Sequence, residues 1–211
     1  MPESEQVTRA LADADLILLG GDITHFGDDS AAARIIGPLN KYQKPVFAVS
    51  GNCDYPQVNA TLENAHMDLE DRRREFDGLS LTGLNGSLPC PGMTPNERTE
   101  SEYKHLLEKY INQHYNSGDH LILVSHQPPF GTLCDRLDSG RHVGSQAIRA
   151  FILRVQPLLC FTGHIHEGIG IDRIGRTVIV NPGPFRSGHY AYAEINVTPA
   201  RADITEIRLI N

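Results

Sequence analysis

Two histidines that are two residues apart follow a short apolar stretch near residue 160. His164 and His166 come after residues 158–161, which are apolar and uncharged. Such a run predicts a buried strand, and residues i and i+2 of an extended backbone point to the same side. Ligands collect at the carboxyl ends of strands in open α/β sheets. The pair therefore predicts two metal-ligating imidazoles at the end of a buried strand.

The same arrangement, an apolar run that leads to a residue able to bind a metal, occurs three more times. The residues are Asp22 after residues 16–19, Asn52 after residues 46–49 and His126 after residues 121–124. Each run predicts a strand that enters a turn, and four such strand ends in one sheet would bring all five side chains together. One carboxylate, one amide oxygen and three imidazoles suit manganese, iron or zinc better than calcium or magnesium.

Four short motifs, taken in order, resemble those of the calcineurin-like metallophosphoesterases. They are Gly21-Asp22, Gly51-Asn52-Cys53-Asp54, Ser125-His126 and Gly163-His164-Ile165-His166. The match extends from about residue 15 to residue 185, and residues 180–183 resemble the Asn-x-Gly turn of the smaller bacterial and archaeal members. The resemblance implies an α/β fold of two packed β-sheets flanked by helices, a four-layer sandwich, in a single domain over residues 1–211.

The resemblance also implies a function. We expect a metal-dependent phosphoesterase that hydrolyses phosphodiesters or small phosphate monoesters with metal-activated hydroxide. By family position, the ligands of the second metal are Asp22, Asn52, His126 and His164. Asp22 would bridge to a first metal that His166 also binds. The expected cofactors are two divalent ions (manganese, iron or zinc), and the expected partner is a small phosphate-ester substrate.

The start of the chain departs from the family pattern. The resembling enzymes open with a strand that ends in Asp-x-His, which supplies two ligands of the first metal, and no such tripeptide occurs in the 211 residues. Residues 3–13 instead predict a helix. The simplest hypothesis is a late start relative to an ancestral chain, so that the first strand is missing and one metal alone binds tightly.

The alternative function is a catalytically impaired member of the fold that serves as a protein-binding module. A metallo-β-lactamase-type hydrolase is disfavoured because its His-x-His-x-Asp-His run is absent.

Further candidate residues surround these motifs. Cys53 stands where the family has a histidine that assists protonation of the leaving group; it is either a weak general acid, which would favour activated esters, or a buried small residue. For Asp54 we expect a polar role in catalysis. Residues expected to contact substrate phosphate are His25, Arg141 and His142, and also Arg136 and the amides of a helix start at Ser145. Solvated or structural roles remain open for these residues.

Composition narrows the class of protein. The chain has 19 Lys plus Arg against 26 Asp plus Glu, a net charge of −7, so strong nucleic-acid binding is not expected. Arg72, Arg73 and Arg74 stand among acidic residues and predict a solvated segment.

Four cysteines without C-x-x-C spacing predict reduced thiols and a cytoplasmic location. No apolar run approaches the ~18 residues of a membrane span and no signal peptide is visible, so no membrane association is expected. The oligomeric state stays open.

Periodicity and turn chemistry place the remaining elements. The sequence predicts a helix over about residues 31–42, with N-caps among residues 28–30, and a hairpin that turns at Asp77-Gly78. Further helices are expected to begin after the caps Thr99 and Ser145. Residues 177–180, 189–197 and 203–210 are predicted to be strands of a second sheet.

Overall fold

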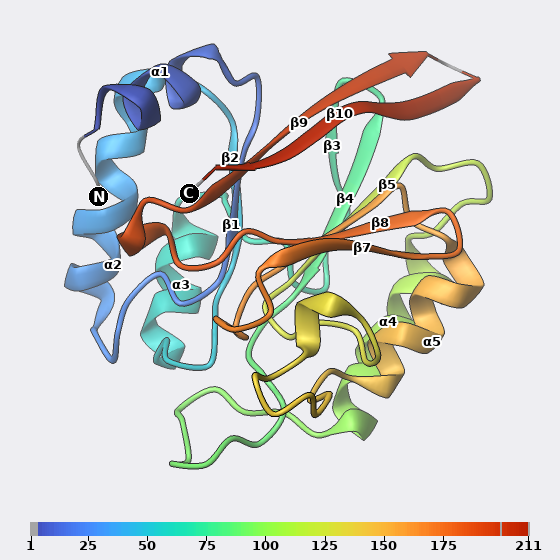
Figure 1. Cartoon of the computed structure of the whole chain (residues 1–211). Coiled ribbons are helices and arrows are strands. Elements are labelled where there is room, and N and C mark those ends of the chain that lie inside the picture. Colours follow the sequence, from blue (N-terminus) through green and yellow to red (C-terminus); the bar gives the residue numbers. More distant parts are fainter. Residues whose placement is uncertain (1–3, 199, 211) are drawn as a thin grey trace.

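The computed structural model describes residues 4–198 and 200–210, which fold into alternating helices and strands (Figure 1). The helices are α1 (Glu5–Asp13), α2 (Asp29–Ile36), α3 (Pro56–Asn64), α4 (Glu100–Gln113) and α5 (Gln146–Val155), with 3-10 turns η1 (Gly37–Tyr42), η2 (Leu133–Asp135) and η3 (Phe185–Ser187). The strands are β1 (Ile17–Gly20), β2 (Val46–Val49), β3 (Arg74–Phe76), β4 (Leu79–Leu84), β5 (Leu121–Ser125), β6 (Leu159–Thr162), β7 (Gly170–Ile174), β8 (Thr177–Asn181), β9 (Tyr190–Thr198) and β10 (Arg201–Ile210).

The strands form three hydrogen-bonded groups. Six strands make a mixed sheet in the order β3-β4-β5-β6-β8-β7, in which β4, β5, β6 and β8 run parallel. Strands β1 and β2 form a parallel pair, and β9 and β10 form an antiparallel hairpin. Isolated bridges from Ala48 to Asp68 and from Glu70 to Gly83 connect β2 through residues 68–70 to β4.

The apolar side chains pack in three clusters that separate four layers. One cluster joins β1 and β2 to α1, α2 and α3, and a second joins the six-stranded sheet to α4 and α5. The third lies between the sheets and receives side chains from the β9–β10 hairpin. Figure 1 shows the two helical layers on opposite sides of the strands. The expected α/β fold of packed sheets flanked by helices is therefore confirmed.

Local chemistry explains where the helices begin. Thr99 and Glu102 form a reciprocal capping box at the start of α4, and the Ser145 side chain accepts a hydrogen bond from the amide of Ile148 at the start of α5. These caps satisfy amides that have no partner within the helix. Both predicted caps are confirmed, as is the hairpin turn at residues 77–78. Of the helix expected over residues 3–13, residue 3 lies outside the described residues and Glu5–Asp13 is helical.

Two predictions were wrong, one about the extent of a helix and one about the sheet to which a strand belongs. The single helix expected over residues 31–42 ends as an α-helix at Ile36 and continues as the 3-10 turn η1, because Pro38 has no N–H to continue α-helical bonding. The three C-terminal strands do not share a second sheet. Strand β8 lies inside the six-stranded sheet, and its five residues are all buried, as a strand covered on both faces requires.

The arginine run is not simply solvated. Arg73 pairs with Asp119, and both Arg72 and Arg74 pair with Asp68. These ion pairs hold the segment before β3 against the rest of the domain. Among the described residues, no helix has the length and apolar character that a membrane crossing needs.

Candidate active site

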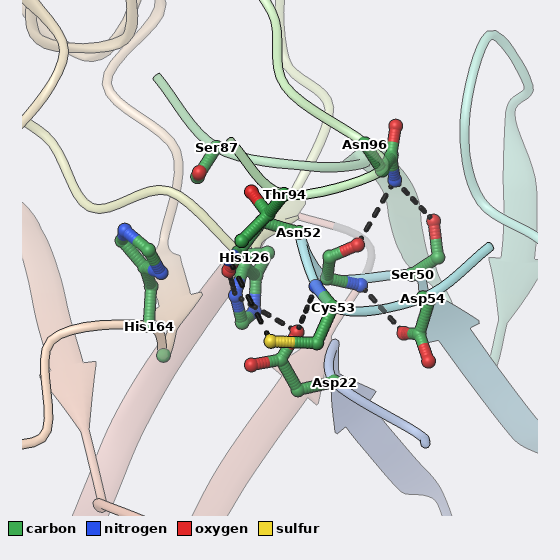
Figure 2. Close-up of polar contacts among 12 residues, drawn as sticks. Asp22, Ser50, Asn52, Cys53, Asp54, Ser87, Thr94, Asn96, His126 and His164 are labelled. Atoms are coloured by element: carbon green, nitrogen blue, oxygen red, sulfur yellow. Dashed lines mark hydrogen bonds and ion pairs between the residues drawn. The ribbon is translucent and has the colours of Figure 1, made fainter. Parts of the chain in front are cut away.

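The predicted ligands gather beyond the carboxyl ends of β1, β2, β5 and β6. Figure 2 shows Asp22, Asn52 and His126 side by side, with dashed contacts that link them through Cys53. His126 is at the centre and is 2 % exposed, and Asn52 is also buried. Strand ends therefore bring these three side chains together, as the sequence predicts.

The His126 ring faces hydrogen-bond acceptors on both sides. Its Nδ1 lies 2.8 Å from the carbonyl oxygen of Gly20, which can only accept, so Nδ1 carries the proton. Its Nε2 lies 2.9 Å from Asn52 Oδ1 and 3.5 Å from Asp22 Oδ1. A neutral imidazole has one N–H, which here is at Nδ1. Its Nε2 therefore has a lone pair that points toward two oxygen atoms, which also carry only lone pairs.

This convergence fits a divalent metal. One imidazole nitrogen, one amide oxygen and one carboxylate oxygen meet with no donor between them, and Asn52 turns its amide nitrogen away, toward Cys53 Sγ at 3.7 Å. The donors suit a borderline cation, and the Gly20 carbonyl orients the ring as outer partners of metal-bound histidines do. Over residues 4–198 and 200–210, no group of three or more His, Cys, Asp and Glu side chains is placed to hold a metal; the cluster depends on the Asn52 amide as its third donor.

Asp22 is held in place by an uncommon backbone conformation and by the turn after β2. Its φ is 49°, in the left-handed region that non-glycine residues rarely adopt. The backbone N–H of Cys53 donates to Asp22 Oδ1 at 2.9 Å. Strained residues of this kind persist only where the surroundings fix them, and they concentrate at functional sites.

The close approach of the two turns requires glycine at position 51. A Cβ at Gly51 would overlap the carboxylate and the backbone nitrogen of Asp22. We expect Gly51→Ala to displace Asp22, to lower metal-dependent activity at least about ten-fold and to lower the free energy of unfolding by about 1–3 kcal/mol. Urea unfolding and metal-dependent turnover check this. Gly37→Ala is the matched control, because a Cβ there meets nothing within 4 Å; equal effects of the two substitutions would contradict the prediction.

His164 lies next to this cluster in a different backbone conformation from the one expected. Its φ is 66°, and the N–H of Ile165 donates to the carbonyl of Gly163 at 2.7 Å. The prediction that both histidines project from extended backbone was therefore wrong: His164 is at the apex of a γ-turn. Its ring centroid is 5.1 Å from that of His126, and its Nε2 lies 3.7 Å from Cys90 Sγ.

The turn that carries the histidine pair is supported by Asn181 at the end of β8. The buried Asn181 amide donates to the carbonyl of Ile165 at 2.7 Å and accepts from Gly183 N–H at 3.0 Å. This is the Asn-x-Gly turn expected from the sequence. It ties the end of β8 to the loop after β6, so Asn181 positions the histidines through their backbone.

Burial and neighbouring positive charge keep these imidazoles neutral. Burial lowers the pKa of His164 to about 3. Burial also lowers the pKa of the outer residue, His166, and the charge of Arg186 contributes next. Neutral imidazole is the form that binds metals, so both side chains are available as ligands at neutral pH.

The lowered pKa of His164 predicts a pH dependence of stability. In the unfolded chain His164 takes up a proton below pH ~6.5, whereas in the folded chain it stays neutral down to about pH 3. The unfolded state therefore binds more protons in this window, and stability falls as the pH is lowered through it. Urea midpoints at pH 7.5 and 5.0, measured in a chelator, should differ less for His164→Asn than for the wild type. Identical differences would contradict this assignment.

The two residues predicted to act in catalysis occupy different surroundings. Burial and the Asp22 charge raise the pKa of the Cys53 thiol to about 12, so the thiol is protonated and weakly nucleophilic at neutral pH. Asp54 is fully buried and accepts hydrogen bonds from the amides of Ile23, Thr24 and Gly51 at 2.7–2.9 Å, and from the Thr24 hydroxyl at 2.8 Å. It joins the Asp22 turn to the Asn52 turn. Direct catalytic roles for both residues stay predictions.

The residues predicted to bind substrate do not form one cluster. His25 is exposed and packs edge-on against Phe26 at 4.8 Å. His142 donates toward the buried Asp135, with 2.8 Å between Nδ1 and Oδ1, and Arg141 is exposed on the same loop. No observation ties these three to a phosphate, and their role stays a prediction.

The amides at the start of α5 are not free to bind phosphate. The Glu100 carboxylate accepts from the N–H groups of Gln146 and Ala147 at 2.7 and 3.0 Å, and from the Ser145 hydroxyl at 2.7 Å. A carboxylate from α4 therefore already occupies this helix N-terminus. The expectation that these amides contact substrate was wrong.

Several site residues carry no sequence signal of their own. Asn96, in the loop between β4 and α4, donates to the Ser50 hydroxyl and the Gly51 carbonyl, both at 3.0 Å, and thus clamps the turn that holds Asn52 (Figure 2). Arg186 brings a positive charge close enough to act on His166. The loop composition indicates turns but not which strand end the loop contacts, so these residues could be found only from the structure.

Known proteins share this fold. Residues 3–168 match the calcineurin-like phosphoesterase family. The uncharacterized protein MJ1162 of Methanocaldococcus jannaschii is 38% identical over 175 residues, which are 81% of this chain and 78% of that protein.

The crystal structure of TT1561 of Thermus thermophilus has a TM-score of 0.68 at 18% identity and covers 88% of both chains. A putative 5'-nucleotidase from Staphylococcus aureus, in complex with alpha-ketoglutarate, has a TM-score of 0.55 at 14% identity over 90% of this chain and 41% of that chain. The two structures share the fold, and the match over residues 3–168 shows that this protein belongs to the calcineurin-like phosphoesterase family.

Proposed function

We propose that this protein is a metal-dependent hydrolase of phosphodiesters or small activated phosphate esters. The observation that carries the proposal is the His126 ring, whose Nε2 faces Asn52 Oδ1 and Asp22 Oδ1 at the end of the strands. Family membership supports the same reaction class. The cytoplasmic location expected from the sequence stays a prediction.

The residues that would hold a divalent cation, which we propose to be manganese, iron or zinc, are Asp22, Asn52 and His126, with His164 beside them. Such a cation supplies Lewis-acid chemistry: it lowers the pKa of water and offsets the charge of the phosphate. A second cation would depend on His166 and on Asp22 as the bridge. We propose that one cation binds tightly and that the second binds weakly.

The chain's own groups orient the reaction. The Gly20 carbonyl fixes the His126 tautomer, and Asp54 and Asn96 hold the two ligand-bearing turns together. In the hydrolysis, water adds its oxygen to phosphorus, the P–O bond to the leaving group breaks, one proton goes to the leaving group and the other to solvent. Cys53, whose pKa is about 12, is a weak proton donor, which favours leaving groups of low pKa that need little protonation.

Hydrolysis of bis(p-nitrophenyl) phosphate tests the proposal. We expect turnover by the wild type with added Mn²⁺, loss of turnover in EDTA, and at least about a hundred-fold lower kcat/KM for Asp22→Asn. The neutral amide keeps the size of the side chain but removes its charge. Manganese content measured by elemental analysis should fall in the variant. Turnover that persists in both EDTA and Asp22→Asn would reject the proposal.

One observation favours a second candidate, a protein-binding module. Within the part of the chain that the structure describes, β1 pairs with β2 alone, so the other edge of β1 has free backbone groups. Such an edge can accept a strand from a partner. Absence of turnover with every divalent metal tested, together with binding of an extended peptide that protects the β1 amides from hydrogen exchange, would favour this candidate.

A further inference from the structure

A surface cavity lies beside the metal-ligand turns and is flanked by two exposed aromatic side chains. Its volume is about 460 Å³, and its lining includes Phe26, Tyr55, Arg34 and Gln57. Phe26 follows the Asp22 turn and Tyr55 follows Asp54. The N–H of Phe26 donates to the carbonyl of Cys53 at 3.2 Å, so the wall of the cavity is fixed directly to the site. Cavities of this size accommodate small ligands.

The backbone of Phe26 has an uncommon conformation that hydrogen bonds within the chain hold, yet the residue is left exposed. Its φ is 58°, in the left-handed region, where a bulky side chain is an outlier. The residue is 45 % exposed, and its described aromatic contact is a T-shaped one with the exposed His25 ring, with 4.8 Å between the ring centroids. A strained residue that holds an apolar ring in water beside a catalytic site points to a ligand contact.

Tyr55 gives an independent indication. It is the N-cap of α3, a position where Ser, Thr, Asp or Asn would cap the helix, and its side chain makes no capping hydrogen bond. The residue is 42 % exposed and lines the same cavity. The sequence thus has an exposed aromatic ring where helix stability alone would favour a small polar residue.

The polar part of the lining suits a ring that carries hydrogen-bonding groups. Gln57 offers an amide donor and acceptor, and Arg34 offers guanidinium donors; both are exposed, and among the described residues Arg34 makes no ion pair. Two aromatic faces with polar groups at the edge match a nucleobase, since every base has a π-face that stacks on Phe or Tyr.

We propose that this cavity is a subsite for a nucleobase-type aromatic group on the substrate, stacked on Phe26 and Tyr55. The inference rests on the proposed hydrolase function and deepens it: the substrates are phosphodiesters with a nucleoside arm. The ester phosphorus lies at the Asp22 and Asn52 turns, and the nucleoside extends toward α2 and α3.

Two chromogenic diesters with the same leaving group test the subsite. They are the p-nitrophenyl ester of thymidine 5'-monophosphate and methyl p-nitrophenyl phosphate, both assayed with Mn²⁺. We expect the wild type to prefer the thymidine ester, and we expect the ratio of the two kcat/KM values to fall roughly ten-fold in Tyr55→Ala and in Phe26→Ala. Tyr55→Phe retains the ring and should retain the ratio. Leu153→Ala, at an exposed apolar residue of α5, is the control.

The outcomes separate the subsite from the hydrolase function. An equal kcat/KM for the two esters, or a ratio unchanged in both alanine variants, overturns the subsite and leaves the hydrolase standing. If neither ester is hydrolysed, the hydrolase proposal fails, and binding of a fluorescent mant-nucleotide decides the subsite. Binding by the wild type that weakens in Tyr55→Ala and persists in Tyr55→Phe supports it. Absence of binding, or equal binding by all variants, overturns it.

Discussion

Replacement of His126 by alanine is expected to lower the kcat/KM for Mn²⁺-dependent phosphodiester hydrolysis at least about a hundred-fold, a larger loss than removal of an outer-sphere partner causes. The reason is geometric. His126 contributes the one lone pair that faces both Asn52 and Asp22. Without it the two oxygen ligands and the neighbouring His164 remain, an incomplete set for tight binding of a borderline cation. Manganese retained after dialysis should fall together with activity.

The control for this substitution is His105→Ala. His105 is exposed on α4 and far along the chain from the ligand motifs, so its removal deletes an imidazole without touching the site. Urea unfolding of both variants shows whether the loss of activity comes from unfolding. Full metal content and activity in a folded His126→Ala protein would refute the assignment of His126 as a ligand.

The sequence predicted the strand ends of this site well. Each proposed ligand follows a short apolar run, and such runs form buried parallel strands because helices cover one face of each sheet and the apolar cluster between the sheets covers the other. The position of Asp22, Asn52 and His126 at one edge follows from this periodicity alone. The family resemblance, confirmed by the match over residues 3–168, added the proposal that these residues share a metal.

The local backbone at the site could not be predicted. Asp22 and His164 both have positive φ. Asp and His adopt this region more often than most residues, but the preference does not identify which Asp or His will do so, because Cys53 and Asn181 bind these turns from distant parts of the chain. Cys53 lies 31 residues from Asp22 and donates to it. Pairwise contacts over this separation leave no periodic signal in the sequence.

The fold was predicted more completely in its first 160 residues than in the last 51. Caps such as Thr99 are local signals and were read correctly. Strand β8, in contrast, follows β7 in an antiparallel hairpin yet lies beside β6 in the main sheet. The sequence of a short apolar strand predicts that the strand is buried but not which strand it pairs with. Strand order therefore depends on tertiary packing.

Replacement of Asp54 by alanine is expected to lower the free energy of unfolding by about 3–5 kcal/mol, the range for removal of one member of a buried charged network. Burial raises the pKa of this carboxyl, and its hydrogen bonds to Gly51, Thr24 and Ile23 oppose that rise. Alanine would leave three buried amides without acceptors, each at a cost of about 1–3 kcal/mol before relaxation. Urea unfolding against Asp138→Ala, an exposed loop carboxylate, measures the effect.

The same variant separates a positioning role from direct catalysis. If Asp54 holds the two turns together, Asp54→Ala loses stability and metal affinity together, because Asp22 and Asn52 are on the turns that it joins. Added metal should then restore part of both, since ligand binding to the folded state offsets destabilisation. If Asp54 instead transfers a proton to the substrate, activity falls while metal affinity and the urea midpoint stay close to wild type. Its four hydrogen bonds within the chain, and the absence of any exposed surface on it, favour the first result.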